Sequence, residues 1–290
     1  MAAAGAVLAL TSISAAGQSL GEGGQAPQAG CPQEPSQFHE CALARAKTFS
    51  PPRTADGKPD MQGVWRGQTS GVENIEEHAA TGDAAAGPSM IVDPPDRKIP
   101  YQAWAVAKRK DNFEKYVDPN VPCFLSGVPR TLYTPQNFQI IQSPGYVVIA
   151  HERAHGYRII PTGAMPHVGE NVRLWQGSSR GRWEGNTLVV DVTNQMARNW
   201  LDQQGNFFSD AVHVVERFTL VDANTIAYQA LIEDSNVYAR PWTMAFAIRR
   251  SQQAGYEVWE EACHEGERDT QLQTSIGLKI YPGVTAQERK

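Results

Sequence analysis

Strand-like runs recur about every ten residues from Asn137 onward, and this spacing constrains the fold more than any other feature. Turn sequences separate the runs, such as the Ser-Pro-Gly of residues 143–145 and the Glu-Gly-Asn of residues 184–186. Links this short place successive strands side by side and antiparallel, which predicts a meander. The predicted strands lie at residues 137–142, 145–152, 155–161, 172–177, 186–194, 211–221, 224–233, 241–249 and 256–263.

A mainly β, antiparallel up-and-down sheet of this size has two exposed edges. Closing the sheet into a lipocalin-like barrel removes both edges, so we expect a barrel. A two-sheet sandwich is the alternative architecture. The predicted barrel domain covers residues 131–266, and residues 267–290 form a C-terminal tail.

The chain before the barrel is expected to be largely irregular. Residues 17–60 are rich in Gly, Gln, Pro and Ser, and they predict at most one helical turn, near residues 42–47. Residues 61–130 are predicted to form an extended arm. The arm contains one helix at residues 101–117, where aromatic residues recur at helical spacing. We expect this arm and its helix to pack on the barrel.

The N-terminal residues indicate export. Residues 1–16 have a short apolar centre and small residues at its end, which predicts a signal peptide and a periplasmic or secreted protein. Four cysteines behind such a segment predict two disulfides, Cys31–Cys41 and Cys123–Cys263. The second pair requires the ends of the barrel to meet, because the first and last strands of a closed meander are neighbours.

Composition excludes several partner classes. The net charge of −5 argues against nucleic acid, and the sequence contains no apolar run of the ~20 residues that a transmembrane segment needs. Phosphate-binding and dinucleotide-binding fingerprints are missing, as is a nucleophile-elbow motif, so the expected chemistry is free of cofactors. The expected partner is a small-molecule ligand or substrate, and the sequence does not indicate an oligomeric state.

Four ionisable residues in strand-like surroundings are candidates for proton transfer: His155, Asp191, His213 and Glu216. Asp191 lies among valines, so we expect it to be half-buried with a raised pKa. Glu216 alternates with apolar residues on one strand face and should meet an arginine or a ligand, whereas His213 lies on the opposite face. The alternative for Asp191 is a structural hydrogen bond, and for Glu216 a buried Glu–Arg pair.

Other residues are candidates for substrate binding. Arg158 shares strand parity with an apolar residue and is expected to point inward, and Arg180 lies in a basic Gly/Ser-rich run; either would hold an anionic group. The aromatic residues Tyr157, Trp175, Trp183 and Trp242 would line a cavity, or would simply belong to the core.

Residues 151–155 read HERAH, which fits the zincin pattern of two histidines and a glutamate. In zincins this motif lies on a helix, but here strand-like residues flank it on both sides. In a strand the two histidines would lie about 13 Å apart, unless a tight turn brought them together. We therefore assign no metal ligand, and keep a zinc-dependent hydrolase as an alternative.

Several motifs resemble those of a large group of uncharacterised bacterial secreted proteins. They are PDMQGVW, RGRWEGNTLVVDVTN and HVVERF, and the similarity extends from about residue 51 to residue 266. Shorter matches include VPR at residues 128–130, RIIP at 158–161, ARPWT at 239–243 and ACHEG at 262–266. The resemblance implies an exported protein.

The leading functional hypothesis is an exported, cofactor-independent enzyme. It would perform acid–base chemistry, as a lyase, isomerase or hydrolase, on a small organic molecule in a barrel pocket. A non-catalytic carrier of the lipocalin type is the second hypothesis, because a barrel of eight strands has room for one small ligand.

Overall fold

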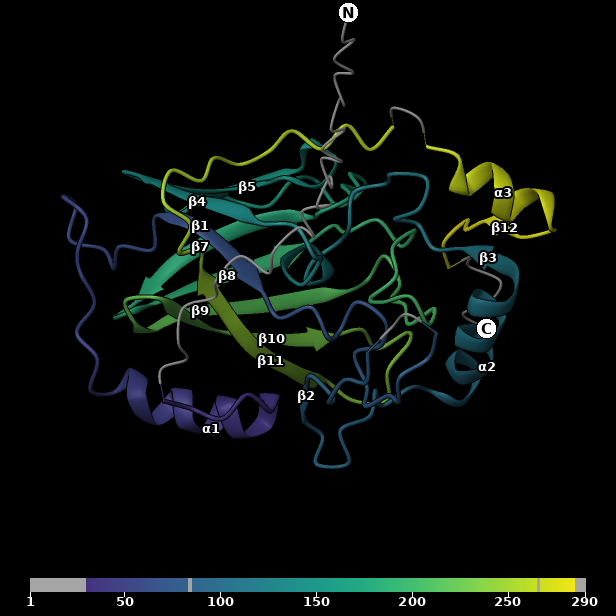
Figure 1. Cartoon of the computed structure of the whole chain (residues 1–290), viewed down its shortest axis with the longest axis horizontal. Helices are drawn as coiled ribbons and strands as arrows, with labels where there is room; N and C mark the ends of the chain where they lie inside the picture. The colour runs from purple at the N-terminus through teal and green to yellow at the C-terminus, as the bar shows by residue number, and fades with distance from the viewer. Residues whose placement is uncertain (1–29, 83–84, 265–266, 285–290) are drawn as a thin grey trace, which may run out of the picture.

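The computed structural model describes residues 30–82, 85–264 and 267–284. Nine strands form the wall of the structure (Figure 1). They are β1 (Gly63–Gly67), β4 (Phe138–Ser143), β5 (Tyr146–His151), β6 (Tyr157–Pro161), β7 (Ser178–Glu184), β8 (Thr187–Thr193), β9 (His213–Asp222), β10 (Thr225–Glu233) and β11 (Trp242–Arg250). The expected signal peptide at residues 1–16 lies outside the described part of the chain.

These strands form one antiparallel sheet that curls into a nearly closed barrel. The order is β6-β5-β4-β1-β11-β10-β9-β8-β7, and a short strand, β2 (Ile91–Asp93), also pairs with β11. The predicted mainly β fold and barrel are therefore confirmed, and the alternative sandwich is wrong, because a single sheet contains every strand of the wall.

Side chains of β9 alternate between the two faces of the sheet. In β9, Val214, Glu216, Phe218 and Leu220 are buried, whereas the residues between them are partly exposed. One face of the strand therefore points into the barrel and the other outward. The pairing of β9 with β8 and β10 extends this alternation across three strands.

Three predictions about strands were wrong. β1 was not predicted as a strand, yet it pairs with both β4 and β11, so the first and last strands of the meander are not neighbours. Residues 172–177 form no strand and end in a turn at Gly177, whose φ of 69° is left-handed. Residues 256–263 are also not a strand, because Glu152 binds this segment through the Tyr256 hydroxyl and the Trp259 amide.

Helices and short strands cover parts of the barrel (Figure 1). α1 (Pro35–Ala46) is longer than the predicted single turn, and its Phe38 and Ala42 pack on Val221 and Ala247 of the outer sheet face. The predicted helix at residues 101–117 is confirmed as α2 (Ala103–Lys115). β3 (Tyr116–Val117) follows α2 and pairs with β12 (Lys279–Ile280), which lies just after α3 (Asp269–Ser275).

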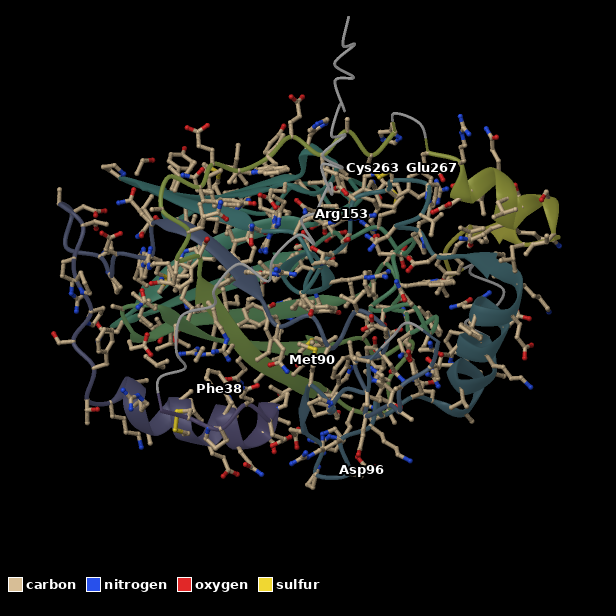
Figure 2. The ribbon with its side chains drawn as sticks, viewed as in Figure 1. Phe38, Met90, Asp96, Arg153, Cys263 and Glu267 are labelled. Carbon is tan, nitrogen blue, oxygen red and sulfur yellow. A yellow bond between two sulfur atoms is a disulfide. The ribbon has the colours of Figure 1, made fainter. Side chains whose placement is uncertain are left out.

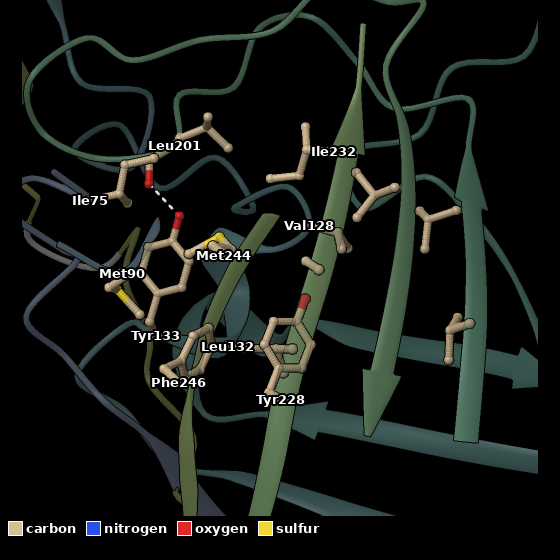
Figure 3. Close-up of a cluster of buried hydrophobic side chains, with 14 of the residues drawn as sticks. Ile75, Met90, Val128, Leu132, Tyr133, Leu201, Tyr228, Ile232, Met244 and Phe246 are labelled. Carbon is tan, nitrogen blue, oxygen red and sulfur yellow. Dashed lines mark hydrogen bonds between the residues drawn. The ribbon is translucent and has the colours of Figure 1, made fainter. Parts of the chain in front are cut away.

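Aromatic side chains fill the interior of the barrel. Figure 3 shows Tyr133 and Tyr228 around Phe246, with ring centroids 5.7 and 4.7 Å from it. The Tyr133 hydroxyl donates a 2.5 Å hydrogen bond to the carbonyl of Leu201, so its one polar group is satisfied. The interior shown there is a packed core rather than an open channel.

Both predicted disulfides are confirmed, at Cys31–Cys41 and Cys123–Cys263. The first closes the loop around the start of α1. The second joins the segment after β3 to the segment after β11. The segment after β11 crosses one side of the barrel, and its Cys263 lines a cavity together with Arg153; both residues are labelled in Figure 2. Cys263 reaches Cys123 through this crossing segment, not through the predicted final strand.

Candidate functional site

The barrel has a seam between β6 and β7, the two strands that end the sheet order. These edges are close: a side chain at Gly181 would place its Cβ 2.9 Å from Ile160. They are nevertheless not paired as a ladder. A cavity of about 440 Å³ opens at this seam, partly covered by the loop of residues 162–177.

Five of the ten predicted site residues line this seam cavity: His155, Tyr157, Arg158, Trp175 and Arg180. The other five do not, and two of these are tryptophans. Trp242 is fully buried in the main core, and Trp183 packs against that core from the end of β7. Both follow the alternative interpretation, in which a tryptophan in a strand serves packing.

The inward orientation predicted for Arg158 is confirmed, and of the arginine or ligand expected to meet Glu216 the structure shows an arginine, Arg158. Arg158 Nη2 lies 2.5 Å from Glu216 Oε2, and neither side chain is more than 2% exposed. The Tyr228 hydroxyl also donates to Glu216, at 2.9 Å, and Arg158 donates to Ser179 Oγ at 3.0 Å. Burial and then the charge of Glu216 raise the pKa of Tyr228 well above its ordinary value. These contacts form a structural network beneath the seam cavity.

Asp191 lies on the opposite face of the sheet from Glu216. Its register partner is Val215, whereas Glu216 pairs with Val190, so the two carboxylates cannot share a cavity. Asp191 Oδ1 lies 2.8 Å from His167 Nε2, and Oδ2 lies 2.8 Å from His213 Nε2. Partial burial raises the pKa of Asp191, but the hydrogen bonds from the histidines outweigh burial and lower it. The predicted raised pKa was therefore wrong.

His213 lies between two carboxylates. Its Nε2 contacts Asp191, and its Nδ1 lies 2.9 Å from Glu233 Oε2. Partial burial lowers the pKa of His213, but hydrogen bonds to Asp191 and Glu233 outweigh burial and raise it above the ordinary 6.5. A protonated His213 keeps the Asp191 carboxylate ionised, which suits Asp191 to accept a second hydrogen bond from His167.

His167 and Ser178 were missed by sequence reasoning and complete the arrangement. His167 Nδ1 lies 3.2 Å from Ser178 Oγ, and Ser178 lines the seam cavity while being only 3% exposed. An unbroken hydrogen-bonded chain therefore runs from Glu233 through His213, Asp191 and His167 to Ser178. We call it the relay. A histidine that donates from Nε2 to Asp191 leaves Nδ1 free to accept the serine proton.

Arg180 positions the loop that carries His167. Its Nε donates to the carbonyls of Met165 and Pro166, at 3.1 and 2.7 Å, and one Nη donates to the Ser179 carbonyl at 2.7 Å. The carbonyls of Met165 and Pro166 belong to the two residues that precede His167 in the chain. No pattern in the loop sequence indicated this contact, because it depends on a side chain fifteen residues away.

The HERAH residues do not form a zincin helix. Residues 153–155 make a single short turn, and Ala154 and His155 both have left-handed φ, at 49° and 53°. His151 is buried beside Thr131, and burial lowers its pKa to about 3; His155 instead lies 3.5 Å from Glu260. Glu152 accepts hydrogen bonds from Asn137 and Tyr256. Within residues 30–82, 85–264 and 267–284, no three His, Cys, Asp or Glu side chains are arranged to hold a metal ion.

Of the three helices in the described chain, none is long and apolar enough to cross a membrane.

The site is a cavity at the barrel seam, with a serine in its wall that ends a relay of histidines and carboxylates. Comparisons with protein families, with curated proteins and with solved structures found no match to this chain.

Proposed function

We propose that the protein is an exported enzyme that performs acid–base chemistry on a small organic molecule in the seam cavity. The relay carries this proposal, because it connects two partly exposed carboxylates and two histidines to a hydroxyl in the cavity wall. The two disulfides and the resemblance to secreted proteins support export.

Among lyase, isomerase and hydrolase chemistry, the relay favours hydrolysis of an ester-like bond. Ser178, His167 and Asp191 occupy the roles of nucleophile, base and orienting carboxylate. As Ser178 Oγ attacks the substrate carbonyl, His167 Nδ1 takes the serine proton and then gives it to the leaving alcohol. Water repeats these steps to release the acid. His213 and Glu233 hold Asp191 ionised and in place.

The cavity favours an uncharged substrate over the anionic one expected from sequence. Arg158 is neutralised by Glu216, and Arg180 uses its Nε and one Nη to hold backbone carbonyls of the covering loop and of β7. Trp175 and Tyr157 offer apolar and aromatic surface beside Ser178. We infer a small ester with an apolar body.

The second candidate is a carrier that binds a small molecule without altering it. The apolar part of the cavity wall favours a carrier. It consists of Leu125, Ile159, Val168 and Leu174. A carrier requires these walls but not the relay. The two functions therefore differ in their response to substitution of His167.

Hydrolysis of p-nitrophenyl acetate by the purified protein separates the two functions. We expect Ser178→Ala and His167→Gln to lose about a hundredfold or more of the rate. His39→Gln is the matched control, because His39 lies on α1, outside the seam cavity and the relay, and should retain the rate. Circular dichroism checks that each variant folds. Equal rates for all four proteins contradict the enzyme, and a near-stoichiometric unaltered ligand released from the purified protein supports the carrier.

A further inference from the structure

The outer face of three neighbouring strands, β4, β5 and β6, is apolar and exposed. Ile141, Val148 and Ile159 are direct register partners across these strands, so their side chains form one row on that face. Tyr157 faces the same side of β6 as Ile159, and the two residues are 66% and 53% exposed. Apolar residues that cluster at the surface in this way indicate a face that a partner covers.

This face continues into the mouth of the seam cavity. Tyr157 and Ile159 belong to the cavity wall, and so does Leu174 of the covering loop, which is also exposed. We call Ile141, Val148, Tyr157, Ile159 and Leu174 the apolar collar. A protein partner seated on the collar would cover the cavity mouth. A lipid surface on the collar would instead present amphiphilic molecules to the cavity.

The outer face around the collar is uncharged, unlike the outer faces of other strands. The outward side chains of β4, β5 and β6 include Gln139, Ile141, Ser143, Tyr146, Val148, Ala150, Tyr157 and Ile159. On β7 and β9, in contrast, the outward residues Arg182, Glu184 and Arg217 form ion pairs. The chain has a net charge of −5, and none of this charge lies on the collar. A neutral face of an acidic protein complements zwitterionic headgroups better than anionic ones.

Exposed aromatic residues lie at both ends of the same face. Tyr146 begins β5, and the backbone amide of Trp259 donates to Glu152, the residue after β5. Both aromatic residues are exposed. Tyrosine and tryptophan are typical of membrane–water interfaces, because each joins an apolar ring to a polar group. Figure 1 shows β4 and β5 on the side of the structure opposite to α1, so that helix does not cover this face.

We propose that the apolar collar docks on a phospholipid bilayer with zwitterionic headgroups. The aliphatic side chains of the collar enter the boundary between headgroups and acyl chains, and the aromatic rings anchor at the level of the headgroups. Docking turns the mouth of the seam cavity toward the lipid, so an ester with an apolar chain enters the cavity from the bilayer. This source of the substrate rests on the proposed function, whereas docking itself does not require catalysis.

Co-sedimentation of the full chain with phosphatidylcholine vesicles tests docking. Ser178→Ala should bind the vesicles as strongly as the unchanged protein, because docking does not need the proposed nucleophile. Ile141→Ser and Ile159→Ser should each weaken binding about fivefold or more, since each removes an apolar side chain from the contact with lipid. Ile276→Ser is the matched control, because Ile276 follows α3, is 74% exposed and lies outside the collar, so binding should be unchanged.

Failure of the protein to bind the vesicles overturns the proposal, and so does binding that Ile141→Ser and Ile159→Ser leave unchanged. A dimer that Ile141→Ser dissociates, seen by analytical ultracentrifugation, shows that a second copy covers the collar and also overturns it. Hydrolysis of dissolved p-nitrophenyl acetate separates docking from the proposed function. Ile141 lies outside the cavity wall, so Ile141→Ser should keep the hydrolysis rate while it loses vesicle binding. A protein that binds vesicles through the collar without hydrolysing the ester contradicts the enzyme and supports docking.

Discussion

At the scale of single residues, the barrel contains a buried ion pair, Arg158 with Glu216, whose side chains are 2% and 0% exposed. Arg158 and Glu216 compensate each other's charge, Tyr228 donates a hydrogen bond to Glu216, and Ser179 accepts one from Arg158. A buried pair of this kind adds little net stability over an apolar pair of the same volume. Replacing only one of the two partners leaves the charge of the other uncompensated in the core.

We therefore predict that Glu216→Gln destabilises the protein by about 3–5 kcal/mol. The double variant Arg158→Met with Glu216→Gln should be less destabilised than Glu216→Gln alone, because no unpaired charge remains. Urea unfolding of the three proteins measures both differences. A cost of about 1 kcal/mol or less for the single variant, as for an exposed pair, would contradict this interpretation of the core.

Residue identity predicted part of the site, and geometry supplied the rest. Glu216 was predicted to meet an arginine or a ligand because it alternates with apolar residues, and in the structure it meets Arg158. Asp191 was predicted to have a raised pKa from its valine neighbours alone. The two histidines that lower its pKa come from positions 24 residues before and 22 residues after it, so local pattern could not show them.

At the scale of elements, the local sequence pattern predicted the long strands correctly. It did not predict short strands, or segments whose conformation depends on contacts with distant residues. Strands β9 and β10 alternate clearly and are separated by a tight turn, so their sequence specifies them. β1 has only five residues and depends on both of its neighbours. Residues 256–263 carry a strand-like pattern, but hydrogen bonds to Glu152 hold them instead of a ladder.

The same limit applies to α1 and to the loop that covers the seam. α1 is a polar segment that is stabilised by Phe38 and Ala42 on the outer sheet face, a contact set by the tertiary fold. The loop of residues 162–177 is placed by Arg180 and brings His167 to Ser178. Sequence periodicity carries no information about either contact.

At the scale of the whole molecule, the Cys123–Cys263 disulfide spans 140 residues and encloses most of the barrel. Replacing both cysteines with serine should destabilise the protein by about 4–5 kcal/mol in the chain-entropy description. The matched control is the double serine variant of Cys31 and Cys41. These cysteines are only 10 residues apart, so we expect a smaller loss of about 2–3 kcal/mol. Thermal and urea unfolding compare the two variants, and an equal or larger loss for the short loop would contradict the prediction.

The central claim is that the nearly closed barrel places a reactive serine in a cavity at its seam. Reaction with a fluorophosphonate, followed by peptide mass spectrometry, tests this claim most directly. We predict one phosphonyl adduct on Ser178 and strongly slowed labelling in His167→Gln. Ser179 should remain unlabelled, because it follows Ser178 in the chain but faces Arg158 in the core. An unlabelled protein, or equal labelling of Ser178 with and without His167, would contradict the account.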